Sequence, residues 1–197
     1  MIKRAFDILA STTALLLLLP LFLLLALAVA LSSPGGAFFR QVRVGKEGRN
    51  FSLLKFRTMR PGSEAKGQIT VGGRDPRITG IGYVLRKSKL DELPQLLNVL
   101  LGDMSIVGPR PEVPKYVALY SAEQREVLSV RPGITSLASI AYINENEVLG
   151  RSSDPERTYI EEVMPAKLAL DLEYVKEKGL FRDFKIILGT LRRLLTA

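Results

Sequence analysis

Two adjacent carboxylates, Asp91 and Glu92, lie in the most chemically dense stretch of the sequence, which runs from Ser88 to Pro111. Pro94 is best placed in the first turn of a helix, so both carboxylates should lie at or near the N-terminus of that helix. The helix dipole there favours ionised carboxylates and lowers their pKa. An ionised carboxylate can attack phosphorus, and it can also bind Mg²⁺. The alternative is structural, with Asp91 capping the helix and Glu92 balancing its dipole.

Basic side chains surround this stretch, and their charge suits a phosphate ligand. Arg110 stands between Pro109 and Pro111, and two prolines stiffen the backbone, so the guanidinium can bind phosphate bidentately at low entropic cost. Arg131 precedes a rigid Pro-Gly turn in the same way, although a surface turn with an incidental charge explains it equally well. The candidate phosphate-binding residues are Lys55, Arg57, Arg86, Arg110, Pro111 and Arg131.

The composition restricts the chemistry further. The 197 residues include no histidine and no cysteine, which excludes Ser-His-Asp triads, thiolate catalysis, disulfides and His-ligated zinc. The formal net charge of +8 predicts an anionic partner: nucleic acid, a lipid surface or a phosphate-bearing substrate. Aromatic residues make up only 7%, and the basic residues gather around the two carboxylates, so nucleic acid is not expected. Neither a Walker A motif nor a complete dinucleotide fingerprint is present.

An uncharged apolar run extends from Ile8 to Leu31, preceded by Lys3 and Arg4. This run is long enough for a helix that spans a membrane, which needs about 20 residues. Pro20 near its middle favours another arrangement, a re-entrant helix pair. Each arm of about 12 residues would measure roughly 18 Å, which is too short to cross a hydrocarbon core of about 30 Å. Basic residues flank the run on both sides, which fits two cytoplasmic ends.

A cleaved signal peptide is a third interpretation of the same segment. Its basic start and a cleavage-like Ala28-Val29-Ala30 sequence fit a signal peptide. However, the apolar run exceeds the roughly 7–15 residues that are usual for the apolar region of a signal peptide.

After Gly36 the pattern predicts a small domain of strands and helices. Strands are expected over 37–44 and 51–59, joined by a turn as a β-hairpin. The glycine-rich segment 61–73 should be a loop, and 81–85 is ambiguous between strand and helix. Helices are expected over 93–101, over 113–128 with a possible break at Ser121, and over 155–178 with an interruption at Pro165.

The last segment predicts a basic amphipathic helix. Its apolar residues recur at helical spacing, and its basic residues fall mainly on the rest of the helix surface. Such a helix suits an anionic membrane interface. Taken alone, the pattern favours an ordinary helix that packs its apolar stripe on the core, but the apolar N-terminal segment favours the interfacial role. The apolar stripe comprises Phe181, Phe184, Leu188, Leu191 and Leu195.

Taken in order, these motifs resemble the small monotopic phosphoglycosyl transferases, also called the bacterial sugar transferase family. The resemblance covers residues 1 to about 135, and an ordered series of this kind is far more specific than any one of its members. The series begins with the proline-broken apolar helix and continues with Phe38-Phe39-Arg40-Gln41-Val42-Arg43-Val44-Gly45, Lys55-Phe56-Arg57-Thr58-Met59, Asp75-Pro76-Arg77-Ile78-Thr79, Leu85-Arg86, Leu90-Asp91-Glu92-Leu93-Pro94-Gln95, Gly102-Asp103-Met104-Ser105, Gly108-Pro109-Arg110-Pro111 and Arg131-Pro132-Gly133-Ile134-Thr135.

The resemblance implies a two-step reaction at the cytoplasmic face of the bacterial inner membrane. Asp91 would attack the β-phosphate of a UDP-sugar and release UMP, and undecaprenyl phosphate, a polyprenyl phosphate, would then take the sugar phosphate from the aspartate. Glu92 would orient Asp91 or bind the metal, and Mg²⁺, held by Asp91 and Glu92, would neutralise the diphosphate. The product would start the assembly of a glycan or glycoconjugate such as an exopolysaccharide or lipopolysaccharide.

The resemblance also implies a monotopic enzyme that enters one leaflet of the membrane and contacts its lipids. The expected fold is α/β and mostly helical, with a re-entrant helix in 1–36. A catalytic domain in 37–197 would contain the hairpin and amphipathic interfacial helices. The family break is often Ser-Pro, whereas Leu19 precedes Pro20 here, which predicts a shallower or differently satisfied kink. The transferred sugar, the pathway and the oligomeric state stay open. The alternative function is a membrane-anchored basic module that binds an anionic polymer without catalysis.

Overall fold

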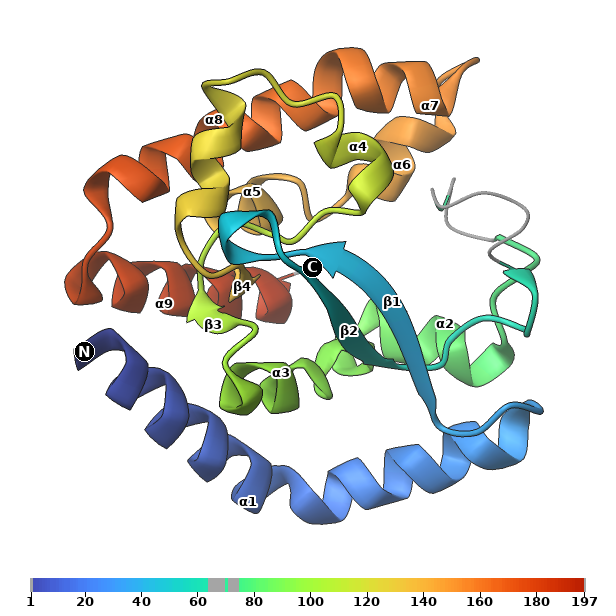
Figure 1. The fold of residues 1–197 in the computed structure, drawn as a ribbon. Coiled ribbons are helices and arrows are strands. Elements are labelled where there is room, and N and C mark those ends of the chain that lie inside the picture. Colours follow the sequence, from blue (N-terminus) through green and yellow to red (C-terminus); the bar gives the residue numbers. More distant parts are fainter. Residues whose placement is uncertain (1, 64–69, 71–74, 197) are drawn as a thin grey trace.

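The computed structural model describes residues 2–63, 70 and 75–196. These residues form a mostly helical molecule with two small two-stranded sheets (Figure 1), which agrees with the predicted mostly helical α/β fold. In chain order the elements are α1 (Ile2–Ser32), β1 (Phe38–Val44), η1 (Lys46–Gly48), β2 (Asn50–Phe56), α2 (Gly80–Lys87), η3 (Leu90–Glu92), α3 (Gln95–Leu101), β3 (Ser105–Val107), α4 (Pro114–Val117), η4 (Gln124–Ser129), β4 (Gly133–Thr135), α5 (Leu137–Ala141), α6 (Glu145–Gly150), α7 (Pro155–Thr158), η5 (Tyr159–Val163), α8 (Met164–Glu177) and α9 (Leu180–Thr196).

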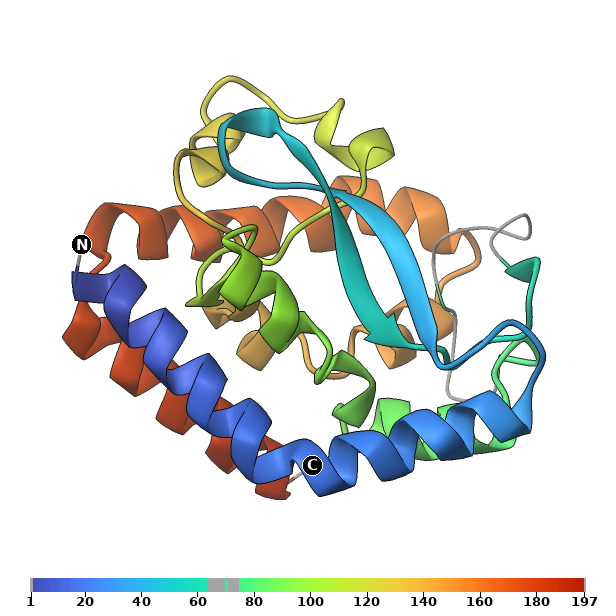
Figure 2. The same ribbon diagram turned by 60° about the horizontal axis from the view of Figure 1, so that its bottom comes forward.

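Helix α1 is the one helix in the described part of the chain that is long and apolar enough to cross a membrane. It continues through Pro20 as a single 31-residue helix and bends near its middle (Figures 1 and 2). Most of its leucines are exposed, whereas Leu25 and Val29 pack with Phe56 and Leu85. The second arm of the helix therefore contacts the rest of the protein, while much of its apolar surface faces outward.

The predicted β-hairpin is confirmed. Strands β1 and β2 pair antiparallel, with Phe38 opposite Phe56 and Val44 opposite Asn50. In the turn, Glu47 adopts a positive φ of 59° and Gly48 one of 74°, a region that glycine enters readily and other residues seldom do. The strand ends near Phe56 rather than at Met59, which forms an isolated bridge with Ile78 instead.

Two short helices follow, and both begin and end for local reasons. The ambiguous segment 81–85 is helical: Thr79 caps α2 by accepting a hydrogen bond from the Gly82 N–H. The predicted helix 93–101 is also confirmed as α3, which begins after Pro94 and ends at Gly102, whose φ is 96°. The two helices thus bracket the segment that carries the adjacent carboxylates.

The prediction of a helix over 113–128 was largely wrong. The structure has only α4 and, after a break, the 3-10 segment η4. The break falls at Ser121, as expected, and has a clear cause: the Ser121 hydroxyl accepts from the Gln124 N–H, and the Gln124 side chain accepts from the Ser121 N–H. This reciprocal capping box starts a new turn instead of extending the old one.

The helical prediction for 155–178 is confirmed, including an interruption near Pro165. Helix α7 passes through the wide π turn η5 before α8 begins, so Pro165 lies in the first turn of α8. Helix α9 is also confirmed. Its exposed stripe of Phe181, Phe184, Leu188 and Leu191 shows that these side chains do not form the core.

The N-terminal parts of α1 and α9 lie close together (Figures 1 and 2), and the Phe6 and Phe184 rings meet edge to face at 5.3 Å between centroids. The two elements with exposed apolar faces are therefore neighbours. The predicted loop 61–73 and the Leu195 side chain lie largely or wholly outside the described residues, and the division into 1–36 and 37–197 stays a prediction.

Candidate active site

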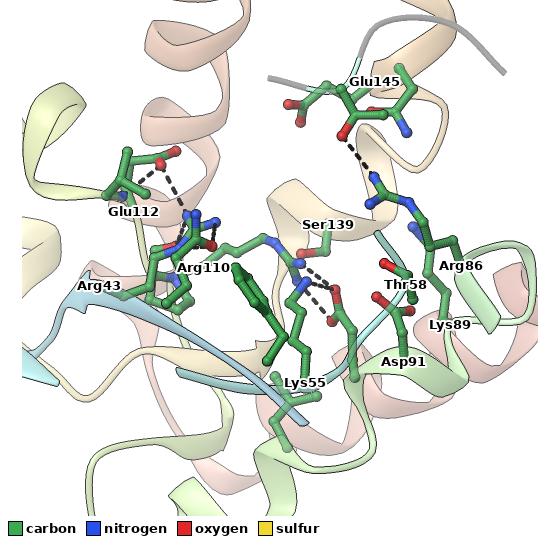
Figure 3. A pocket seen from close by; sticks show the side chains of 18 of the residues that line it. Arg43, Lys55, Thr58, Arg86, Lys89, Asp91, Arg110, Glu112, Ser139 and Glu145 are labelled. Atoms are coloured by element: carbon green, nitrogen blue, oxygen red, sulfur yellow. Dashed lines mark hydrogen bonds and ion pairs between the residues drawn. The ribbon is translucent and has the colours of Figure 1, made fainter. Parts of the chain in front are cut away.

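A cavity formed by the described residues has a volume of about 1090 Å³ and lies between the β-hairpin and helices α5, α6 and α8. Most of the predicted site residues reach it although they are scattered along the chain. In Figure 3, Arg43 and Glu112 lie at one side of this cavity, Asp91, Lys89 and Arg86 at the other, and Arg110 and Lys55 between them. The predicted residues that line the cavity are Lys55, Arg57, Arg86, Asp91, Glu92, Arg110 and Pro111.

Glu92 is the anion at the centre of this cationic cluster. Its carboxylate accepts from the Lys55 ammonium at 2.9 Å and from the Arg110 guanidinium through both oxygens, one of these bonds measuring 3.1 Å. Burial by itself would raise the pKa of Glu92, but Arg110 and Lys55 together outweigh it and hold that pKa well below its usual range. Glu92 is therefore ionised and fully engaged.

Asp91 has a different environment although it is the adjacent residue. Its side chain is buried, lines the cavity and makes no side-chain hydrogen bond with the described part of the chain. Burial raises its pKa above the usual value, and Glu92 adds to the rise, although Lys55, Arg86 and Lys89 oppose it. The prediction that the helix dipole lowers both pKa values is therefore wrong for Asp91, because desolvation dominates.

Local backbone structure sets the two carboxylates apart. Lys89 adopts a left-handed φ of 57°, and a 3-10 turn from Leu90 to Glu92 precedes α3. Asp91 is therefore not the helix cap that the alternative reading required, since the residue at that position is Pro94. Adjacent residues of a 3-10 turn point in directions roughly 120° apart, so the carboxylates occupy separate surroundings.

Asn98 fixes α3, and with it the two carboxylates, against the hairpin. Its side chain is 1% exposed. It accepts from the Leu54 N–H at 2.9 Å and donates to the Ser52 carbonyl at 2.8 Å. An amide that satisfies both backbone groups in a buried setting holds the helix in one register. As a result, Lys55 on β2 faces Glu92.

Arg110 is presented by a sheet that the sequence did not predict. Strands β3 and β4 pair in parallel, and β3 runs directly into the Gly108-Pro109-Arg110 loop. A Cβ on Gly133 would lie 2.1 Å from the Gly108 nitrogen, so only glycine allows the two motifs to touch. Asp171 on α8 supports the loop by accepting from the Arg110 N–H at 3.4 Å.

Two predicted phosphate ligands have other contacts. Arg131 lies apart from the cavity lining that the described residues provide; its Nε donates to the Gly102 carbonyl at 2.8 Å, beyond the end of α3. Arg57 lines the cavity, but its guanidinium also donates to the Phe38 carbonyl at 3.1 Å and to the Gly35 carbonyl. Their role in phosphate binding stays a prediction.

Several residues in the cavity were not expected there. Burial lowers the pKa of Arg43, which pairs with Glu112 at 3.0 Å, and Glu112 also accepts from the Tyr159 hydroxyl. Asp171 is 4% exposed, and burial raises its pKa to about 7. The only sequence signal for Arg43 was its position in the hairpin motif. Asp171 lies 80 residues from Asp91, in an Asp-Leu-Glu sequence that only imitates an Asp-x-Asp motif on an ordinary-looking helix, so its place in the cavity was not predicted.

The described residues contain no group of three or more Asp or Glu side chains that could hold a metal ion. Mg²⁺ often needs only one or two carboxylates when substrate phosphates supply further ligands. Asp91 fits that requirement, since its carboxylate faces the cavity and its oxygens are not hydrogen-bonded to described side chains. Glu92 fits it less well, because both of its oxygens already accept from Arg110 or Lys55.

Comparison with known proteins identifies the family. The model of the bacterial sugar transferase family matches residues 1–197. A UDP-glucose:undecaprenyl-phosphate glucose-1-phosphate transferase of Caulobacter vibrioides is 42% identical over 98% of this chain and 70% of its own length. The exopolysaccharide production protein PSS of Rhizobium leguminosarum bv. phaseoli is 41% identical over 96% of this chain and 93% of its own.

A third relative, a UDP-N-acetylgalactosamine-undecaprenyl-phosphate N-acetylgalactosaminephosphotransferase of Aeromonas hydrophila, is 40% identical, and the match covers 99% of this chain but only 44% of the relative. The three matches extend beyond Thr135, where the motif series stops, and the named transferases act on different sugars. The chain therefore belongs to the bacterial sugar transferase family and is a phosphoglycosyl transferase, as its motifs predict.

Proposed function

We propose that this enzyme transfers a sugar phosphate from a UDP-sugar to undecaprenyl phosphate and releases UMP. The observation that carries the proposal is the unlike environment of two adjacent carboxylates. Glu92 is neutralised by Arg110 and Lys55, whereas Asp91 faces the same cavity without a hydrogen bond to the described residues. A nucleophile needs an oxygen that is not already held by hydrogen bonds. The neighbouring ion pair of Glu92 with Arg110 and Lys55 needs to stay in place.

In the first step an Asp91 oxygen forms a bond to the β-phosphorus. The bond from that phosphorus to the oxygen bridging the two phosphates breaks, and UMP leaves with the bridging oxygen. In the second step an oxygen of the lipid phosphate attacks the same phosphorus, and the Asp91 carboxylate leaves. The products are UMP and a sugar linked to the lipid through a diphosphate.

The cations around Asp91 support this chemistry electrostatically. Lys55, Arg86 and Lys89 all lie close enough to influence the pKa of Asp91, and Arg110 completes the cluster. They favour the ionised carboxylate and attract the diphosphate, which keeps two anions close together. When bound, Mg²⁺ would neutralise part of the diphosphate charge, and Asp91 is the described residue best placed to hold it.

The acceptor is a lipid, and the contacts of α1 support a re-entrant helix at the cytoplasmic face of the membrane. At its start, Lys3 pairs with the buried Asp183 at 2.5 Å; near its end, Val29 packs with Phe56 and Leu85. Both arms of the helix thus contact one domain, whereas a straight spanning helix would carry its ends to opposite faces. The exposed apolar stripe of the adjacent α9 suits the same interface.

The test of the reaction is incubation of the purified enzyme with single UDP-sugars and Mg²⁺, without lipid. Intact-protein mass spectrometry should show the gain of one sugar phosphate, with UMP in solution, and added undecaprenyl phosphate should remove the adduct. The Asp91→Asn variant should form neither adduct nor UMP at wild-type thermal stability. Release of UDP in place of UMP, or an adduct that persists in Asp91→Asn, would refute the proposed chemistry.

Topology is tested separately by single cysteines, since the chain has none of its own. Ile2→Cys and Pro34→Cys lie on either side of the apolar run, and both positions are exposed. In intact cells a membrane-impermeant thiol reagent should label neither, and after lysis it should label both. Labelling of one position alone in intact cells would establish a spanning helix.

A further inference from the structure

Asp7 is a buried carboxylate in the second turn of a helix that is otherwise apolar from Ile8 onward, and its side chain is 2% exposed. A charged group in such a position is unfavourable unless its oxygens are hydrogen-bonded, and such residues in membrane-type helices are usually functional. Asp7 Oδ1 accepts from the Ser105 hydroxyl and from the Ile106 N–H, both at 3.0 Å. Asp7 thus ties the start of α1 to strand β3.

Arg4, one turn earlier, ties the same end of α1 to helix α3. Its guanidinium donates to the Val99 carbonyl at 2.6 Å and to the Leu100 carbonyl at 3.0 Å. These carbonyls belong to the last turn of α3, where a positive charge is favoured by the helix dipole. The Val99 carbonyl also accepts from the Gly102 N–H at 3.1 Å, whereas the Leu100 carbonyl is bonded by Arg4. Arg4 therefore completes the C-terminus of α3.

The two elements held in this way carry the catalytic groups at their other ends. Helix α3 has only seven residues, about 10 Å at 1.5 Å per residue, and it begins at Gln95, three residues after Glu92. Strand β3 ends at Val107, three residues before Arg110. Lys3 adds a direct contact at that point, since its ammonium donates to the Val107 carbonyl at 3.0 Å.

We infer that Asp7 and Arg4 are positioning residues for the reaction: from the membrane helix they fix β3 and α3 relative to each other, and thereby hold Arg110 against Glu92 beside Asp91. The inference rests on the proposed function. Neither residue lines the cavity among the described residues, so both act only through the elements that they hold. The membrane helix in this view is part of the catalytic framework as well as an anchor.

The test is the rate of UMP release in a single turnover without lipid, measured across UDP-sugar concentrations. Asp7→Leu removes the oxygen that accepts both hydrogen bonds and leaves the Ser105 hydroxyl and the Ile106 N–H without this partner. The maximal rate should fall about 10- to 100-fold, because a displacement of about 1 Å at the reacting groups has that effect. The half-saturating concentration should change far less, since the cations that bind the diphosphate remain.

Asp7→Asn keeps an oxygen that accepts the same two hydrogen bonds, so it should retain most of the rate. Thr12→Ala, at an exposed position of the same helix, is the matched control and should behave as wild type. Ser105→Ala should have a small effect alone and none when added to Asp7→Leu, because both changes remove the same contact. If Asp7→Leu does not fold, the smaller changes Ser105→Ala and Arg4→Gln test whether the contacts of α1 with β3 and α3 affect the rate.

Wild-type maximal rates in both Asp7→Leu and Arg4→Gln would overturn the inference, as would equal losses in Asp7→Asn and Asp7→Leu. A loss confined to substrate affinity would also overturn it. These outcomes differ from a failure of the proposed function, in which the wild-type enzyme itself would release no UMP from any UDP-sugar.

Discussion

The ion pairs of Glu92 lead to a prediction about protein stability that differs from the prediction for Asp91. Glu92 is 13% exposed and faces Lys55, at 19%, and Arg110, at 31%. Glu92→Gln keeps the size of the side chain but leaves two half-buried cations close together without their anion. Breaking a buried ion pair by removing one partner destabilises a protein by roughly 3–5 kcal/mol.

We expect the lower end of that range, about 3 kcal/mol, because Arg110 is partly screened by solvent. For a chain of this size each kcal/mol lowers the melting temperature by about 2–4 °C, so the expected decrease is about 6–12 °C. The measurement is thermal unfolding of the detergent-solubilised protein at neutral pH. A decrease of less than about 2 °C would refute the reasoning, because it would mean that the two cations do not need the anion.

Asp91→Asn is the matched control, with the same chemical change one residue away. Burial raises the pKa of Asp91, so its ionised form opposes folding, and the amide should melt at the wild-type temperature or above it. Added pyrophosphate should stabilise Glu92→Gln more than wild type, because its charge replaces the missing carboxylate. Together, the wild-type protein and the two variants test whether Glu92, and not Asp91, is the anion that Lys55 and Arg110 need for stability.

The pH dependence has opposite signs at the two positions. The pKa of Glu92 lies below its usual value of 4.5, so its contribution is present above that pH and is lost as the pH falls through the folded-state pKa. The difference in melting temperature between wild type and Glu92→Gln should therefore shrink in acid. The raised pKa of Asp91 has the opposite effect. The contribution of protonated Asp91 to stability is fully present below the usual pKa of 3.8 and is lost as the pH rises through the folded-state pKa.

Three further predictions concern other parts of the molecule. Arg110→Ala should reduce the rate of UMP release strongly, and Arg110→Lys should retain little more of that rate, because an ammonium cannot form the bidentate contact with Glu92 or with phosphate. Wild-type rates in either variant would remove Arg110 from the site. Burial raises the pKa of Asp171 to about 7, so wild-type stability should fall as the pH rises through 7, whereas Asp171→Asn should melt at nearly constant temperature between about pH 6 and 8. Serine at both Phe181 and Leu188, two exposed apolar positions of α9, should increase the fraction of protein that carbonate or high salt extracts from membranes, and unchanged extraction would argue against an interfacial α9.

Local rules were enough for the parts of this fold that depend on neighbouring residues. The alternating strands around a glycine turn predicted the hairpin, and Pro94 and Gly102 marked the ends of α3. The apolar stripe predicted α9, although only the structure showed that this stripe is exposed. The ordered motifs also identified the family, because their spacing reflects a whole site and not one element.

Non-local contacts determined what the sequence left open. Strands β3 and β4 have three residues each, too few for a periodic signal, and they pair across a gap that no local pattern spans. The same pairing brings Arg110 to Glu92, and Asp7 reaches Ser105 across 98 positions. Adjacent carboxylates look alike in a sequence, yet burial raises the pKa of one while two cations lower that of the other, because desolvation and Coulomb attraction depend on which distant groups the fold brings close.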